Sequence, residues 1–451
     1  MNRRLLSLTL VLVLVFNGVI GVVNAQDPVS ITIRCMASPP EENWRCNNFA
    51  EVEEAVEAEL GIELDLNLIQ DNVGWADYKT EFVLAADANE APDIILSGHE
   101  DIGAWAPAGY IIPLDDMIAE HEEFADIVPA LWESQRYEGV TYGVPQDAEA
   151  RPIFFSKLLL GDLGWSEEEI ESLPERVAAG EYTFEDMLAT ALEAIDEGVV
   201  EPGNGYWHRP SNGFDWLIYY YGMGGEVMTE DGELVLDQEA LLATYELIGS
   251  LTESGATRPD MLGVSNNEVV YPTISTAEDV LFFQGGTWQW SNWALNFVQA
   301  ETEEERRAFL LENIDLMLFP AMDAGVPITL THPLTYMIYS GSEHPDVAMA
   351  LIAAITTPEA NNRHAIDSFH LGILNAQVES EEYQNDPVLS SAHYMLDYTT
   401  NAPNTPLWSS WSNAYWAGIQ AVHTGTNTAE EAVDIMIDQA INELGDDITI
   451  R

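Results

Sequence analysis

The N-terminal third of this chain alternates short apolar runs with segments of helical periodicity, and no other feature of the sequence constrains the fold as much. Residues 29–37, 62–69 and 93–96 are short runs rich in β-branched residues and leucine, a composition typical of buried strands. Residues 47–60 and 75–86 instead place apolar side chains three or four positions apart, as amphipathic helices do. Strands that alternate with helices predict an α/β fold with a parallel sheet.

Ligands of parallel sheets bind beyond the carboxyl ends of the strands, so the loops that follow the predicted strands are candidate binding loops. These loops are polar and span residues 38–45, 70–74 and 97–101. We therefore expect Trp44, His99 and Glu100 near a ligand. The alternative is that His99 and Glu100 are exposed loop residues without a role.

The acidity of the chain limits its partners. Its 451 residues include 77 Asp and Glu against 15 Lys and Arg, a formal net charge of −62 at pH 7. Nucleic acids and anionic lipid surfaces require basic patches, so neither is an expected partner. A phosphate-binding P-loop is excluded because neither lysine, Lys79 or Lys157, lies in the required glycine-rich motif.

The first 25 residues have the pattern of a secretory signal. A positive start at Arg3-Arg4 precedes an almost wholly apolar stretch, and Ala25 offers a cleavage site. The alternative is an uncleaved membrane anchor, which Asn17 and Gly18 within the stretch disfavour. We therefore expect an exported protein, periplasmic or extracellular, that is soluble after cleavage.

Cys35 and Cys46 are the only cysteines, and both follow the predicted signal. In an oxidising compartment they are expected to form one structural disulfide, and the alternative is two unrelated thiols. Cys35 follows Ile33-Arg34 rather than small residues, which argues against lipid attachment.

Signatures of catalytic and metal sites are missing from the sequence. The motifs H-E-x-x-H, G-x-S-x-G and C-x-x-C are all absent, so we predict neither a bound metal nor another cofactor. A carboxylate pair for glycoside hydrolysis needs only proximity in space, and 77 acidic residues leave that chemistry open.

Thirteen tryptophans are bunched along the chain. Trp288 and Trp290 follow the pair Gly285-Gly286, and Trp411 lies in a second bunch. Indole rings among Asp, Glu, Asn and Arg suit sugars, which offer C–H faces for stacking and hydroxyls for hydrogen bonds. Core packing is an equal alternative for any one tryptophan.

Several segments, in the same order and spacing over essentially the whole chain after the signal, resemble one known family. They are APDIIL at 91–96 followed by AGYIIPLD at 108–115, YGVPQDAEAR at 142–151 leading into FFSK at 154–157, GGTW at 285–288, and residues 348–358. The family is the extracellular solute-binding proteins of family 1, the maltose-binding-protein-like receptors of ABC sugar importers.

The resemblance implies a periplasmic-binding-protein type II fold, with two α/β lobes, a hinge and a ligand cleft between the lobes. Lobe 1 would comprise residues 26–142 and 327–376, and lobe 2 residues 143–326 and 377–451. A monomer of this kind would close on a sugar or oligosaccharide and deliver it to the permease in the membrane, without catalysing a reaction.

The resemblance also implies which side chains face the ligand. Those near the hinge are Gln146, Asp147, Glu149 and Arg151, those that stack on the sugar are Trp288 and Trp290, and Trp44 and Trp411 are further candidates. Arg151 is equally expected as a structural ion pair. His332 and His370 are expected to be core histidines.

Two other functions remain open from the sequence. A secreted glycoside hydrolase would share an aromatic cleft but would need two carboxylates about 5–10 Å apart across it. A receptor for a cationic solute such as a polyamine would be favoured by the negative field of the protein.

The charge of −62 predicts that salt stabilises the fold, because self-repulsion between carboxylates opposes the compact state unless it is screened. The urea midpoint should rise between dilute buffer and about 1 M NaCl, where the Debye length falls to ~3 Å. An acidic, lysine-poor surface also suits a saline habitat, and equal stability in the two solutions would contradict that hypothesis.

Overall fold

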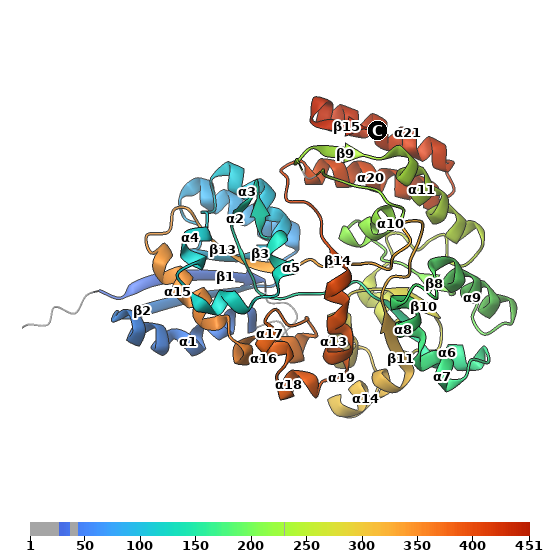
Figure 1. The fold of residues 1–451 in the computed structure, drawn as a ribbon, viewed down its shortest axis with the longest axis horizontal. Helices are drawn as coiled ribbons and strands as arrows, with labels where there is room; N and C mark the ends of the chain where they lie inside the picture. Colours follow the sequence, from blue (N-terminus) through green and yellow to red (C-terminus); the bar gives the residue numbers. More distant parts are fainter. Residues whose placement is uncertain (1–26, 37–43, 230) are drawn as a thin grey trace, which may run out of the picture.

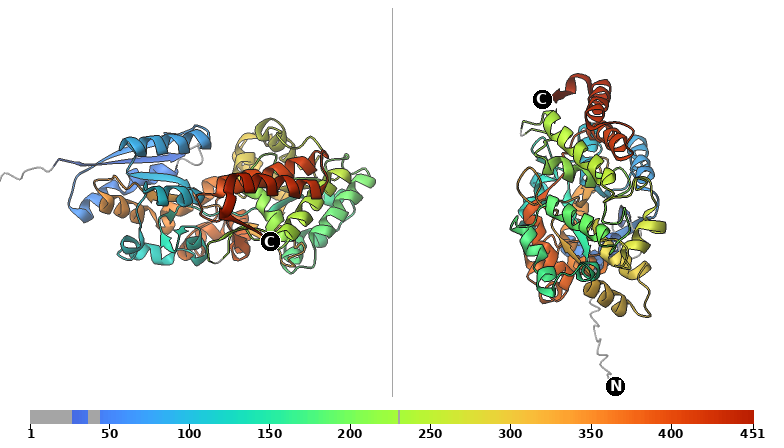
Figure 2. Two further views of the ribbon diagram at one scale, coloured as in Figure 1. Left: turned by 90° about the horizontal axis from the view of Figure 1, so that it is seen from above. Right: turned by 90° about the vertical axis from the view of Figure 1, so that its right-hand side faces the viewer.

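The computed structural model describes residues 27–36, 44–229 and 231–451, which form two α/β lobes side by side (Figure 1, Figure 2). The predicted signal peptide and Ala25 cleavage site lie outside the described residues. Within the described ranges, no helix combines the length and the apolar character that a membrane crossing requires.

Lobe 1 is built on a five-stranded sheet with the order β2-β1-β3-β13-β6. Its strands are β1 (Val29–Met36), β2 (Leu64–Asp71), β3 (Ile94–Gly98), β13 (Leu334–Ile338) and β6 (Val144–Pro145). Strand β1 pairs in parallel with β2 and β3, whereas β13 is antiparallel to β3 and β6. The three strands predicted near the N-terminus are therefore β1, β2 and β3, joined in parallel as expected.

Helices cover both faces of this sheet (Figure 1). They are α1 (Trp44–Leu60), α2 (Trp75–Ala88), α3 (Ile102–Ala108), α4 (Asp115–Ile118), α5 (Pro129–Glu133), α15 (Pro345–Ile355) and α16 (Pro358–Ser368). A short hairpin, β4 (Arg136–Tyr137) and β5 (Val140–Thr141), precedes β6. The helical spacing of α2 buries Tyr78 and Phe82, and the Phe82 ring packs 4.3 Å from that of Trp105 between ring centroids.

Lobe 2 has its own four-stranded sheet with the order β11-β7-β10-β8. These strands are β7 (Ile153–Ser156), β8 (Tyr206–Trp207), β10 (Phe282–Gln284) and β11 (Ile314–Met317). The surrounding helices are α6 (Lys157–Asp162), α7 (Glu167–Glu171), α8 (Leu173–Ala178), α9 (Phe184–Asp196), α10 (Leu217–Gly222), α12 (Tyr271–Ile274), α13 (Gln289–Asn296) and α14 (Glu303–Asn313).

A second layer of lobe 2 unites distant parts of the chain. It contains β9 (Leu234–Leu236), α11 (Gln238–Glu253), α20 (Trp408–His423), α21 (Ala429–Leu444) and β15 (Ile448–Ile450). Strand β15 pairs in parallel with β9, and the three helices pack on one another. The C-terminal tenth of the chain therefore belongs to lobe 2, although it follows segments of lobe 1.

The lobe boundaries differ from those expected. Strand β6 lies in the lobe 1 sheet and β7 in the lobe 2 sheet, so the first crossing is residues 146–152 rather than 143–145. A further link between distant segments pairs β12 (Thr329–Leu330) with β14 (Thr399–Thr400). Helices α17 (Asn375–Val378) and α18 (Glu381–Gln384) pack against α16, and α19 (Pro387–Ala392) follows them. Residues 377–384, expected in lobe 2, thus lie against α16, which contacts both α1 of lobe 1 and α13 of lobe 2.

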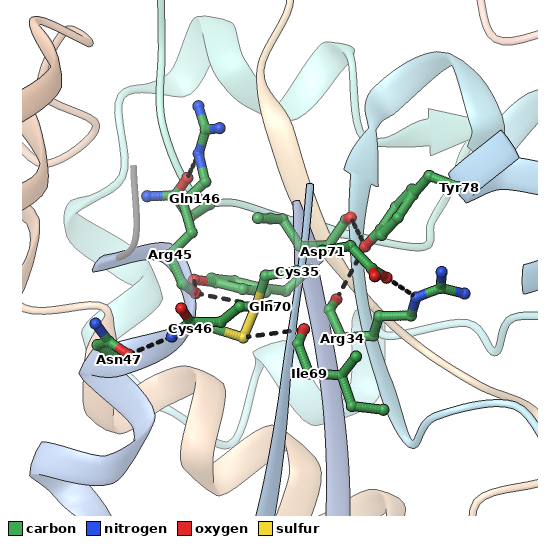
Figure 3. The surroundings of a disulfide bond; sticks show 12 residues. Arg34, Cys35, Arg45, Cys46, Asn47, Ile69, Gln70, Asp71, Tyr78 and Gln146 are labelled. Atoms are coloured by element: carbon green, nitrogen blue, oxygen red, sulfur yellow. Dashed lines mark hydrogen bonds and ion pairs between the residues drawn. A yellow bond between two sulfur atoms is a disulfide. The ribbon is translucent and has the colours of Figure 1, made fainter. Parts of the chain in front are cut away.

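Cys35 and Cys46 form a disulfide between the end of β1 and the first turns of α1 (Figure 3). Both side chains are fully buried in lobe 1. The bond therefore fixes the start of α1, including Arg45, against the sheet.

Removing this disulfide should lower the stability of the protein. The cysteines are 11 positions apart in the sequence, and a closed loop of this size predicts a loss of about 2–3 kcal/mol in Cys35→Ser/Cys46→Ser, measured by urea unfolding. As a control, reductant should destabilise the wild type and leave the double variant unchanged. A variant as stable as the oxidised wild type would contradict the structural role.

Candidate ligand-binding site

The first crossing, residues 146–152, is an extended segment held by its neighbours. The Leu371 N–H donates to the Ala148 carbonyl (2.6 Å), and the Arg151 N–H donates to the Thr329 hydroxyl (2.7 Å). Side chains of extended backbone alternate between two faces. Three charged residues, Asp147, Glu149 and Arg151, consequently project from one face, and the candidate site is assembled along it.

At the lobe 1 end, Asp147 is bound by Arg45 from α1. Arg45 Nη2 donates to Asp147 Oδ2 at 2.9 Å, and Arg45 Nε donates to Gln146 Oε1 at 3.2 Å (Figure 3). Arg45 Nη2 also lies 3.1 Å from His370 Nε2. A guanidinium has only donors, so His370 Nε2 accepts, and its Nδ1–H faces Ser368 Oγ at 2.8 Å.

The protonation states at this end follow from burial and charge. Burial raises the pKa of Asp147, but the charge of Arg45 and the hydrogen bond from His364 lower it, so the carboxylate is ionised. Burial lowers the pKa of His370 well below its usual range, so that imidazole is neutral. The result is a buried Arg45–Asp147 ion pair with a neutral histidine as acceptor.

At the lobe 2 end, Arg151 joins two carboxylates and an aromatic ring. Its Nη2 lies 2.7 Å from Glu149 Oε1, and its Nε lies 2.9 Å from Asp215 Oδ1. Its guanidinium carbon lies 4.2 Å from the centre of the Trp288 ring. Arg209 also approaches Asp215, at 3.8 Å. Arg151 is thus a buried ion pair, one of the two roles expected from the sequence.

Between these ends, His332 bridges two glutamates. Its Nε2 lies 2.7 Å from Glu100 Oε2, and its Nδ1 lies 3.6 Å from Glu149 Oε1. Burial raises the pKa of Glu149, with Arg151 opposing. Burial would also raise the pKa of Glu100, but Lys79 and His332 outweigh it and lower that pKa well below its usual range. His332 is therefore part of this network rather than of an apolar core.

A row of rings leads from lobe 2 to this point. Trp408 stacks on Phe214, with ring centroids 5.2 Å apart and planes 5° apart, and Phe214 lies 4.5 Å from the His332 ring. Trp411 stacks beneath Trp408 at 5.8 Å. Phe214, Trp408 and Trp288 are all partly exposed, so each keeps surface available to a ligand.

The site is close to charge balance, unlike the protein around it. Four of the 15 Lys and Arg side chains meet five carboxylates here, whereas the whole chain has 77 acidic residues. The cations are Lys79, Arg45, Arg151 and Arg209, and the carboxylates are those of Glu100, Asp101, Asp147, Glu149 and Asp215. Burial raises the pKa of Asp101 to about 6, so this carboxyl group becomes protonated only below about pH 6.

The structure brings together most of the side chains expected at the ligand and excludes others. Glu100, Gln146, Asp147, Glu149, Arg151, Trp288 and His99 all belong to this network or border it. Trp290 and Trp411 were expected to face the ligand, but both lie in the lobe 2 core, where Trp290 packs against Phe154 and Trp411 against Tyr220. Trp44 instead contacts Asp367 and Arg363 of α16.

The glycine pair before Trp288 has a different role from the one expected. A Cβ atom at Gly286 would lie 1.6 Å from an atom of the Trp288 ring. The glycine therefore makes room for the indole of its own loop rather than for a ligand.

Other functional residues were not identified from the sequence. Phe214 and Asp215 lie between Trp207 and Trp216, in a segment with no motif, and Lys79 lies on the polar side of α2. Only the scarcity of lysine could have drawn attention to Lys79. In a chain with two lysines and many acidic residues, each lysine is a candidate partner for a buried carboxylate.

A cavity of about 890 Å³ also lies between the lobes, but the predicted ligand residues do not line it. Its walls come from both lobes and the crossings, and include Arg136, Tyr221, Pro327, Asn401 and Asn404. The cavity borders the charged network where Asn404 of its wall lies 3.0 Å from His99 Nδ1.

Replacing Asp147 by asparagine should destabilise the protein by about 3–5 kcal/mol at pH 7, because Arg45 would be left as a buried, unpaired charge. The folded-state pKa of Asp147 lies below the unfolded value, so its stabilisation is present above about pH 3.9 and is lost as pH falls further. Urea unfolding should therefore show a constant stability difference between wild type and variant from pH 7 to about pH 5, and a difference that shrinks as the pH falls from about 4 to 3. Asp116→Asn, at an exposed position, is the control and should change the stability little at any pH. If the stability difference between wild type and Asp147→Asn does not shrink below about pH 4, the ionised pair is contradicted.

Comparison with known proteins gives a consistent result. Residues 50–362, more than half of the chain, match the model of the family "Bacterial extracellular solute-binding protein". The maltotriose-binding protein of Pyrococcus abyssi is 22% identical over 367 residues, which are 76% of this chain and 67% of that relative.

Solved structures share the two-lobed fold at low identity. The GacH receptor of Streptomyces glaucescens, solved unliganded and with acarbose, is 19% identical with a TM-score of 0.70, covering 93% of this chain and 100% of that one. Maltose-bound MalE3 of T. maritima is 16% identical with a TM-score of 0.72, covering 92% of this chain and 100% of that one. With its two lobes, its crossings and the match over residues 50–362, this chain belongs to the bacterial extracellular solute-binding proteins.

Proposed function

We propose that this protein is the exported binding component of an ABC importer, which binds a sugar or oligosaccharide between its lobes and delivers it to the permease. It acts as a monomer after cleavage following Ala25, and it binds its ligand without chemical change. The maltotriose-, acarbose- and maltose-binding proteins to which it is similar support a carbohydrate as the ligand.

The near balance of charge at the site is the observation that carries this proposal. A strongly acidic chain gathers Arg45, Lys79, Arg151 and Arg209 where the lobes meet, and each neutralises a neighbouring carboxylate. An uncharged ligand fits such a site, because it needs hydrogen-bond partners and no countercharge. A polyamine would have to compete with these arginines for the same carboxylates, which disfavours a receptor for cations.

The aromatic side chains supply the other half of sugar recognition. Trp288 is backed by the Arg151 guanidinium, and Phe214 is backed by Trp408. Rings fixed in this way offer apolar faces at little conformational cost, beside the hydroxyl-binding groups of Glu149 and Arg151. The ligand would thereby contact side chains from both ends of the first crossing, which favours the closed arrangement of the lobes.

Truncating Trp288 should weaken sugar binding selectively. Trp288→Ala removes a stacking face worth about 1.5–3 kcal/mol, or roughly 10- to 100-fold in Kd, measured by calorimetry with maltose and maltotriose. Trp165→Ala is the matched control, because Trp165 is partly exposed in lobe 2 and contacts Tyr182 and Arg176, which lie outside the network. Equal loss in both variants, or none in Trp288→Ala, would contradict the proposal.

Two further measurements on the same samples distinguish sugar binding from glycoside hydrolysis and from the binding of a cationic solute. Maltotriose recovered intact after long incubation fits a binding protein, whereas shorter products would indicate a glycoside hydrolase. Sugar affinity should change little between low and high salt, because the ligand is uncharged. Spermidine binding that falls steeply with salt, in a protein that binds no sugar, would favour the cationic alternative.

A further inference from the structure

The end of β3 brings two potential metal ligands next to a third from a distant segment. His99 and Glu100 follow β3 directly, and His332 precedes β13, the strand that pairs with β3. The His99 and His332 rings lie 5.2 Å apart between centroids. One ligand atom from each of His99, Glu100 and His332 lies within 4.8 Å of the others.

The tautomer of His99 is fixed by its neighbour Asn404. The Asn404 amide nitrogen donates to the carbonyls of Ser134 (2.7 Å) and Arg136 (2.9 Å), which leaves its Oδ1 as an acceptor. This oxygen lies 3.0 Å from His99 Nδ1, so Nδ1 carries the proton. His99 Nε2 is then an unprotonated lone pair.

This lone pair is buried and lacks a partner. His99 is 0% exposed, and none of the residues that the structure describes forms a hydrogen bond with its Nε2. A buried acceptor without a donor is costly, unless a ligand occupies the position. A histidine whose other ring nitrogen donates to a fixed oxygen is also the arrangement that orients metal-binding imidazoles.

Glu100, the carboxylate ligand, is also held in place by a neighbouring side chain. Its Oε2 faces His332 Nε2 at 2.7 Å, while its other oxygen contacts Lys79. Lys79 thus holds the carboxylate by one oxygen and leaves the second for a metal. On binding, a metal would displace the proton that His332 Nε2 now shares with Glu100.

We propose that His99, Glu100 and His332 form a site for a divalent transition-metal ion, with Zn²⁺ the best fit. Two imidazoles and one carboxylate are a typical zinc ligand set, and they leave an open coordination position. Mg²⁺ and Ca²⁺ prefer sites made only of oxygen ligands, so they should bind here weakly. The site goes beyond the proposed sugar-binding function, although it shares Glu100 and His332 with that network and His99 borders it.

A second group of similar composition does not qualify. Asp147, His364 and His370 also place three ligand atoms close together. Arg45 Nη2, however, lies 2.9 Å from Asp147 and 3.1 Å from His370. This fixed positive charge occupies the face that a cation would need, so we expect no metal there.

Calorimetry with ZnCl₂ and untagged, metal-stripped protein tests the site without any sugar. We expect one saturating Zn²⁺ per chain, weak Mg²⁺ binding in a parallel titration, and at least tenfold weaker Zn²⁺ binding in both His99→Ala and His332→Ala. His121→Ala is the matched control, because His121 also lies near a carboxylate, 4.0 Å from Glu123, but outside the cluster. The affinity of this variant for Zn²⁺ should match that of the wild type.

X-ray absorption of the zinc-loaded wild type keeps the test valid if a variant fails to fold. It should show two imidazole ligands at the bound zinc. Absence of saturable zinc binding, unchanged affinity in His99→Ala, or zinc held only by oxygen ligands would overturn the proposal. Because sugar is absent from these experiments, their outcome is independent of whether the protein binds a carbohydrate.

Discussion

The buried ion pair between Arg45 and Asp147 is the interaction on which the rest of the site depends. It attaches the first crossing to α1, which the Cys35–Cys46 disulfide in turn fixes to the lobe 1 sheet. Once Asp147 is fixed, the alternation of extended backbone directs Glu149 and Arg151 to the same face. The crossing is thus both the connection between the lobes and the scaffold of the site. Such a pair is costly to break, which keeps the register of this segment unique.

The distribution of charge explains how so acidic a protein can present a neutral site. The surface carries most of the carboxylates, where water and salt screen them. Four of the 15 Lys and Arg side chains lie in the charged network, where Arg151 and Arg209 meet Asp215. Buried carboxylates without these partners would be forced toward the protonated state. Scarce basic residues are therefore used where desolvation makes a countercharge necessary.

Local patterns predicted the parallel strands β1 to β3 and the helices α1 and α2, whereas the family resemblance pointed to Asp147, Glu149 and Arg151. Neither source distinguished Trp288 from Trp290. Trp288 precedes α13 and is partly exposed, whereas Trp290 lies in the first turn of that helix and is buried in the core. Phe214 was missed for a related reason: its value depends on stacking with Trp408, almost two hundred positions away. The family resemblance likewise placed the first crossing at residues 143–145, because pairing of β6 with β13 is a tertiary contact.

The central claim is that the ligand is held jointly by both lobes, so that binding draws them together. Pulsed electron spin resonance between nitroxides at Leu84→Cys on α2 and Leu158→Cys on α6, both exposed positions, measures this directly. The account predicts that saturating maltotriose changes the distance between the labels and narrows its distribution. A bound sugar that leaves the distribution as it was would contradict joint binding by the two lobes.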